Sequence, residues 1–169
     1  MRIQNMLTAV AVIMIVLSVL PVQAVSAQAT STHCEAELTV LEFEEGEITF
    51  VGPNMHMRGR NVVFEQVSAN PLCSGRISVI ANYNLDANGD GPKWGTFYLE
   101  ASPGAAYTGG FEGTFTAWSE EYTVISSVNA VGQGYGDLEG LKIHEYIDFD
   151  FSISPQGIAT LTILNPNGK

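Results

Sequence analysis

The chain has 169 residues, two cysteines and a formal net charge of −11 at pH 7, and 46% of its residues are hydrophobic. This composition is typical of one folded domain with a single core. The negative charge weighs against partners that are themselves negative, namely nucleic acids and anionic lipid headgroups, and favours a soluble protein outside the cell.

The first residues have the pattern of an export signal. Arg2 supplies a positive charge, residues 6–20 form an apolar run, and small residues that suit cleavage follow a proline. The run is shorter than the roughly 18 to 20 residues of a membrane-spanning helix. We therefore predict a signal peptide over residues 1–29 and one domain over residues 30–169, secreted or on the periplasmic or cell-envelope exterior, without stable membrane insertion. An uncleaved membrane anchor is the alternative.

Two cysteines, Cys34 and Cys73, lie beyond the predicted signal. In an oxidising compartment an isolated pair most simply forms one disulfide, which we predict here. Closing a loop of that size would stabilise the fold by roughly 4 kcal/mol. A redox or metal-binding pair is the alternative, but the CxxC spacing and the histidine cluster that it needs are missing.

Beyond the signal, apolar and polar residues alternate in runs separated by turn residues, which is the pattern of β-strands. Eight such runs are predicted, over residues 35–43, 55–67, 76–85, 94–101, 111–118, 122–131, 141–151 and 159–163. Eight antiparallel strands at hairpin spacing can close a small, calycin-like β-barrel and leave no unpaired edge. A two-sheet sandwich is the competing architecture, because alternation alone does not distinguish the two.

Glycine recurs at alternate positions in residues 132–141, with the sequence GQGYGDLEGL. A dinucleotide-binding fingerprint would need a strand before it and a helix after it, whereas a period-two pattern follows this segment. The glycines are therefore predicted to mark a bend or bulge between two strands, where a side chain would collide or φ must be positive.

Together with residues 109–115, which read GGFEGTF, this segment resembles the allene oxide cyclase-like barrel superfamily. That superfamily includes plant dirigent proteins and small bacterial proteins of unknown function. The resemblance implies an eight-stranded barrel with a mainly apolar interior. The plant members are often trimeric, so it also implies a homo-oligomer, a trimer or a dimer, as a candidate assembly. The catalytic residues of the plant cyclase do not map onto this sequence, so no activity is carried over.

A few polar residues share the strand faces that we expect to point inward. They are Asn61, Glu65, Tyr83, Tyr122 and Glu145, and they are the candidate ligand-binding residues. A carboxyl group among apolar side chains has a raised pKa and can exchange a proton with a ligand, which makes Glu65 and Glu145 the candidate catalytic residues. Alternatively, either glutamate lies in water at a barrel mouth, or pairs with an arginine after a bulge has changed the register.

Asp86, Asn88 and Asp90 place oxygen ligands at alternate positions, like the opening of a calcium-binding loop. Phe97 stands where an EF-hand needs its bidentate glutamate, and no helix is predicted beside the loop. An exposed hairpin turn prefers the same residue types. Calcium is therefore only a weak candidate cofactor, and no other cofactor is indicated.

Three functions remain open. The first is a secreted barrel that binds a small hydrophobic ligand without chemistry of its own. The second is an isomerase or cyclase that acts on a lipid-like substrate through Glu65 or Glu145. The third is a structural or adhesive protein whose barrel is filled by its own side chains, and only this one predicts no cavity.

Overall fold

The structure is a computed structural model that describes residues 28–116, 125–150, 156–166 and 168. The predicted signal peptide up to residue 27, and Tyr122, lie outside the described residues. In the described part of the chain, no helix is long and apolar enough to cross a membrane.

The described residues form antiparallel strands and one 3₁₀ turn, η1. The elements are β1 (Thr30–Glu44), β2 (Glu47–Val51), β3 (Asn54–Ser68), η1 (Pro71–Cys73), β4 (Gly75–Leu85), β5 (Gly91–Ser102), β6 (Ala105–Thr116), β7 (Ile125–Gly136), β8 (Lys142–Asp150) and β9 (Gln156–Asn165). Neighbours in the chain pair in sequence from β2 to β9, and β1 pairs with both β9 and β3.

The pairing of β1 with β3 closes a ring of eight antiparallel strands, namely β1 and the strands from β3 through β9, and so forms the predicted barrel. The sandwich alternative is wrong. β2 was not predicted and lies outside the closed ring, where it pairs with the first residues of β3.

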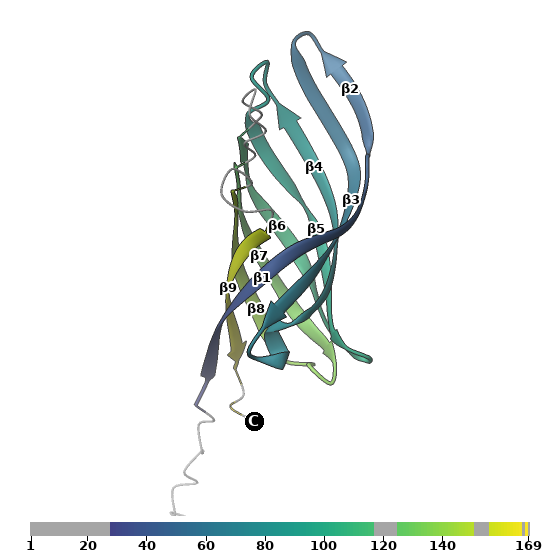
Figure 1. The fold of residues 1–169 in the computed structure, drawn as a ribbon. Coiled ribbons are helices and arrows are strands. Elements are labelled where there is room, and N and C mark those ends of the chain that lie inside the picture. Colours follow the sequence, from purple (N-terminus) through teal and green to yellow (C-terminus); the bar gives the residue numbers. More distant parts are fainter. Residues whose placement is uncertain (1–27, 117–124, 151–155, 167, 169) are drawn as a thin grey trace, which may run out of the picture.

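The barrel has two unlike ends (Figure 1). At one end, the hairpin of β2 and β3 rises beyond the other strands, beside the β4–β5 turn. At the opposite end lie η1, the β5–β6 and β7–β8 turns and the C-terminus. We call the first the hairpin end and the second the η1 end.

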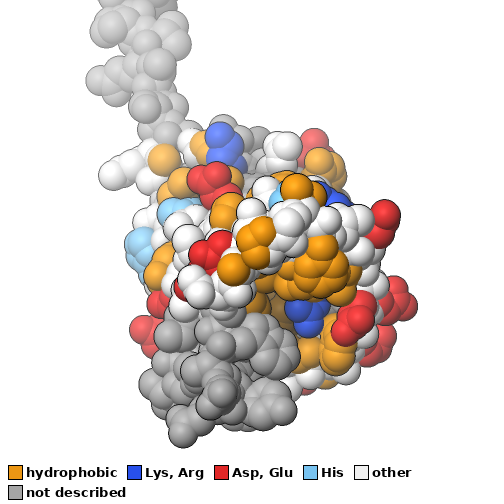
Figure 2. Space-filling view, turned by 90° about the horizontal axis from the view of Figure 1, so that it is seen from above, with side chains coloured by type: hydrophobic (Ala, Val, Ile, Leu, Met, Phe, Trp, Pro, Cys, Tyr) orange, Lys and Arg blue, Asp and Glu red, His pale blue; other side chains and the backbone are white. Residues whose placement is uncertain are grey.

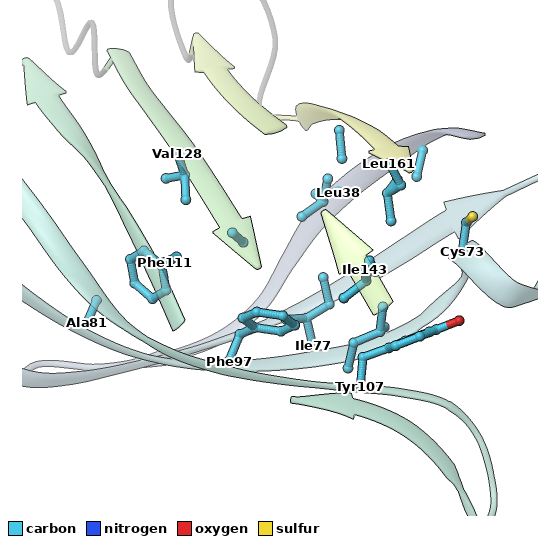
Figure 3. Close-up of a cluster of buried hydrophobic side chains, with 14 of the residues drawn as sticks. Leu38, Cys73, Ile77, Ala81, Phe97, Tyr107, Phe111, Val128, Ile143 and Leu161 are labelled. Atoms are coloured by element: carbon cyan, nitrogen blue, oxygen red, sulfur yellow. The ribbon is translucent and has the colours of Figure 1, made fainter. Parts of the chain in front are cut away.

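Alternate residues of each barrel strand face inward and form one core. Side chains from β1 and β4 to β9 converge there (Figure 3). The fully buried apolar ones include Leu38, Leu99, Tyr107, Ala159 and Leu161.

The η1 end is tied and packed. Cys34 of β1 and Cys73 of η1 form the predicted disulfide, with their Cα atoms 6.4 Å apart. The buried amide of Gln66 donates to the Cys73 carbonyl over 2.8 Å. Tyr107 is fully buried without a partner for its hydroxyl, and burial raises its pKa to about 12. The disulfide and these buried side chains therefore hold β1, β3, β6 and η1 together at this end.

The glycine segment lies differently from the prediction. β7 continues through Gly132 and Gly134 and ends only at Gly136, so these glycines are part of a strand and the turn follows them. The physical reason given for them is confirmed. A Cβ on Gly134 would lie 2.0 Å from the Leu138 carbonyl oxygen, and Gly136 has a φ of +62°.

Candidate functional site

A cavity of about 60 Å³ lies inside the barrel. Its wall is mostly apolar and is formed by Leu38, Val62, Phe64, Ile77, Val79, Ala81, Tyr83, Lys93, Phe97, Phe111, Val128, Ala130, Glu145, Ile147 and Phe149. Seen onto the hairpin end, a basic side chain lies among hydrophobic ones, with acidic side chains to one side (Figure 2). By this measure one water molecule needs about 10 to 15 Å³, so the cavity has room for several and the barrel is not completely filled.

Three aromatic rings in this wall are held by glycines on neighbouring strands. A Cβ would lie 2.8 Å from the Phe111 ring if placed on Gly95, and 2.4 Å from the Phe149 ring if placed on Gly157. On Gly132 it would lie 2.7 Å from the Phe97 ring. Each ring thus packs closely against a position without a side chain.

Glu145 of β8 points into this cavity, as the alternation of its strand predicted. Its exposed fraction is 2%, and its Oε1 atom has no hydrogen-bond partner. Burial raises the pKa of its carboxyl group from 4.5 to about 7, because the ionised form loses its hydration. At neutral pH this carboxyl group is therefore divided between its neutral and its ionised form.

Lys93 of β5 is the second charged side chain in the wall, and it is 9% exposed. Its Nζ donates a hydrogen bond to the Ser126 hydroxyl on β7. Burial, and secondarily the positive charge of Arg60, lower its pKa from 10.5 to about 8. Lys93 and Glu145 do not form an ion pair with each other.

Arg60 of β3 lies beside this lysine at the hairpin end. Its guanidinium group lies near the Tyr83 hydroxyl and 5.5 Å from the centre of the Phe43 ring. Its Nε atom is buried without a partner. Burial raises the pKa of Tyr83, and the nearby positive charge of Arg60 partly opposes this rise. Lys93, Arg60 and Tyr83 thus form one polar cluster, which we call the cationic cluster.

The structure corrects the predicted faces of β3. Glu65 is exposed on the outer face, and Asn61 lies between two inward-facing neighbours, Arg60 and Val62. The cause is a one-residue bulge, in which three steps along β3 from Met57 to Arg60 oppose two steps along β4. Neither residue therefore belongs to the cavity wall, which removes Glu65 from the candidate catalytic residues.

Local chemistry accounts for the bulge. Gly59 supplies a φ of +70°, which other residues rarely adopt. The Arg58 guanidinium donates to the Met57 and Tyr83 carbonyl oxygens over 2.8 and 2.6 Å, and to the Asn84 side chain over 2.6 Å. A glycine between two arginines inside an apolar alternation was the signal for this break.

The prediction for Tyr83 is confirmed in its orientation, since it lines the cavity. Tyr122 lies outside the described residues. Sequence reasoning missed Lys93 and Ser126. A signal was present for both, because an even number of residues along a strand separates side chains of the same face. Lys93 stands at such a spacing from Phe97 in β5, and Ser126 from Val128 in β7.

The candidate calcium loop is a hairpin turn between β4 and β5. One carboxylate oxygen of Asp86 accepts hydrogen bonds from the backbone N–H groups of Asn88 and Asp90, over 2.8 and 3.0 Å. These bonds lower the pKa of Asp86. No group of three or more His, Cys, Asp or Glu among the described residues is arranged to hold a metal ion. The side chain of Asp86 thus serves the turn, which is the use that such sequences commonly have.

A second hollow, of about 470 Å³, lies at the η1 end between β1, η1, the β7–β8 turn and β9. Most of its wall residues, such as Thr30, Asp137 and Glu139, are exposed. It is a surface depression that holds no buried charged group, so the interior cavity is the stronger candidate site.

A scan against protein-family models, a search of curated proteins and a search of solved structures each found no match to this chain. The fold and the site define its class as a closed eight-stranded β-barrel with a small, mainly apolar internal cavity. The resemblance to the allene oxide cyclase-like superfamily stays a prediction.

Proposed function

We propose that this protein is an exported β-barrel that binds a small hydrophobic ligand in its interior. The observation that carries this proposal is the cavity between the aromatic rings of Phe97, Phe111 and Phe149, with buried polar groups directed into it. Ligand sites of proteins commonly combine an apolar wall with a few oriented polar groups in this way. The disulfide between Cys34 and Cys73 supports the extracytoplasmic part of the proposal.

The cavity favours this function over a purely structural barrel. A barrel that serves only as a scaffold gains stability from complete filling, because each void forfeits packing contacts. It also gains nothing from a buried lysine and a buried glutamate that do not pair, since each loses hydration energy. Proteins commonly retain voids and unpaired buried charges at sites where they bind a ligand.

Native mass spectrometry of the protein purified from its own host tests the proposal. We expect an additional, apolar mass on part of the molecules, released by organic solvent. The matched comparison is between Ala130→Leu, which fills the cavity from β7, and Thr96→Leu, which places the same leucine side chain on the exposed face of β5. The proposal fails if the wild type carries no ligand, or if Ala130→Leu retains as much ligand as Thr96→Leu.

One observation favours a second candidate, an isomerase or cyclase acting on a lipid-like substrate. Glu145 is a buried carboxyl group without a partner at Oε1, and its pKa of about 7 suits proton exchange at neutral pH. On a ligand identified as above, Glu145→Gln would then abolish turnover while binding persists. Turnover that survives in Glu145→Gln would rule this candidate out.

A further inference from the structure

The cationic cluster brings two positive charges to the hairpin end of the cavity. Lys93 of β5 is paired with Tyr83 of β4, and Arg60 of β3 is paired with Ala81, the neighbouring inward residue of β4. The two cations therefore flank the same strand on the inner face of the barrel. Tyr83 lies on that strand, close enough to Arg60 for the arginine's charge to lower the pKa of its hydroxyl.

Neither cation has a carboxylate partner in the described part of the chain. The ion pair found there joins Arg76 to Glu42 over 2.9 Å, and both side chains are on the outer surface. Lys93 makes a hydrogen bond to a neutral hydroxyl, that of Ser126, and the buried Nε of Arg60 makes none. On a protein with a net charge of −11, a buried lysine beside a half-buried arginine, without a counter-ion among the described residues, is an unexpected arrangement.

Within the residues that the structure describes, Lys93 and Arg60 lack a negative charge between them that would offset their mutual repulsion. Two like charges in a poorly hydrated region raise each other's free energy, and the weaker base responds by a lowered pKa. Lys93 shows this response, since Arg60 is one of the two causes of its lowered pKa. A bound anion would remove the repulsion and accept charge-assisted hydrogen bonds, which are stronger than neutral ones.

The rest of the cavity limits the kind of anion. Its volume of about 60 Å³ suits a carboxylate with a short apolar chain rather than a long lipid. The rest of the wall is mostly apolar, with Phe97, Phe111 and Val128 among its residues. Glu145 lies in the same wall, and when it is ionised it would repel a second negative charge on the ligand.

We propose that the ligand is a small apolar monocarboxylate, whose carboxylate accepts a hydrogen bond from Lys93 beside Arg60 and whose chain packs against Phe97, Phe111 and Val128. This inference rests on the proposed binding function and names the chemical class of its ligand. It also gives Lys93 a role that the apolar wall does not provide, which is to select an acid over the alcohol of the same shape.

The test compares butyrate with 1-butanol, which have similar chains and differ in charge. Dissociation constants are measured by NMR chemical-shift titration of the disulfide-bonded protein at pH 6.5 and low salt. We expect butyrate to bind at least about ten-fold more tightly than 1-butanol, as one charge-assisted hydrogen bond allows. Lys93→Met should remove this preference without weakening 1-butanol, and Lys142→Met, on the exposed face of β8, should change neither affinity.

A second measurement does not depend on a variant. Binding of butyrate should raise the pKa of Lys93, followed through its side-chain NMR signals, and 1-butanol should leave it unchanged. Equal affinities for butyrate and 1-butanol in the wild type would overturn the inference but leave the proposed function standing. So would displacement of butyrate by equimolar inorganic phosphate, since the apolar chain would then contribute nothing. If neither compound shifts any signal of the cavity wall, the inference and binding of a small apolar ligand both fail.

Discussion

The substitution Glu145→Gln should stabilise the protein at alkaline pH and leave its stability nearly unchanged in acid. Glutamine has the shape of the protonated side chain but cannot ionise. In the wild type, the folded state holds this carboxyl group at a pKa of about 7, whereas an unfolded chain holds it near 4.5. The folded state therefore binds the proton more tightly, and the wild type loses stability as the pH rises from 4.5 through about 7.

The magnitude follows from that difference. A pKa raised from 4.5 to about 7 corresponds to about 3 kcal/mol. Glu145→Gln should thus exceed the wild type in free energy of unfolding by about 3 kcal/mol at pH 8 and about 2 kcal/mol at pH 6, with little difference at pH 4.5. The other carboxyl groups titrate alike in both proteins and cancel in the comparison.

Urea denaturation with the disulfide intact, at these three pH values, measures the effect. For a domain of this size, a gain of 3 kcal/mol raises the midpoint by about 1 M or more. The matched control is Glu65→Gln, because Glu65 is exposed on the outer face of β3 and its substitution should stay within about 0.5 kcal/mol at every pH. A difference between Glu145→Gln and the wild type that does not vary with pH would refute the assignment of Glu145 to the interior.

Three further predictions concern the barrel itself. Lys93→Met should raise the free energy of unfolding by about 3 kcal/mol at pH 7. This gain should shrink between pH 8 and 10.5, because the lysine's lowered pKa makes the folded wild type more stable as the pH rises. A gain that stays constant up to pH 10.5 would contradict this reasoning. Gly132→Ala should lower the melting temperature and cost about 1 to 3 kcal/mol in free energy of unfolding, since its Cβ would lie 2.7 Å from the Phe97 ring. Gly110→Ala, whose nearest contact would be at 3.6 Å, should not lower it. Equal effects of the two substitutions would refute the role of the close approach. Cys34→Ser should lower the free energy of unfolding by roughly 4 kcal/mol, measured by urea denaturation against the reduced wild type, which should match it.

The strands themselves were readable from the sequence because their signals are local. Turn residues separate the runs, and each run alternates with the period of a strand. In β4 and β8 no residue interrupts the alternation, so the inward orientation of Tyr83 and Glu145 was predicted correctly. The disulfide followed equally well, since the chain has only two cysteines.

The predictions failed where a strand departs from strict alternation or where its ends are ambiguous. The bulge at Gly59 shifts every later residue of β3 to the other face, which moved Glu65 outward and Arg60 inward. Lys93 was left outside the predicted strand, which began at residue 94, although it is the third residue of β5. Both errors hid the cationic cluster.

The sequence by itself therefore determined the number of barrel strands, the cross-link and one internal carboxyl group, because periodicity, turn chemistry and cysteine count are properties of short segments. Only the tertiary structure decided which face of β3 lines the barrel and whether the interior is filled. Register is defined by the partner strand, and a cavity is the remainder after side chains from all eight strands have been packed together. Lys93, Arg60 and Tyr83 form a cluster for the same reason, since strand pairing alone brings β3, β4 and β5 side by side.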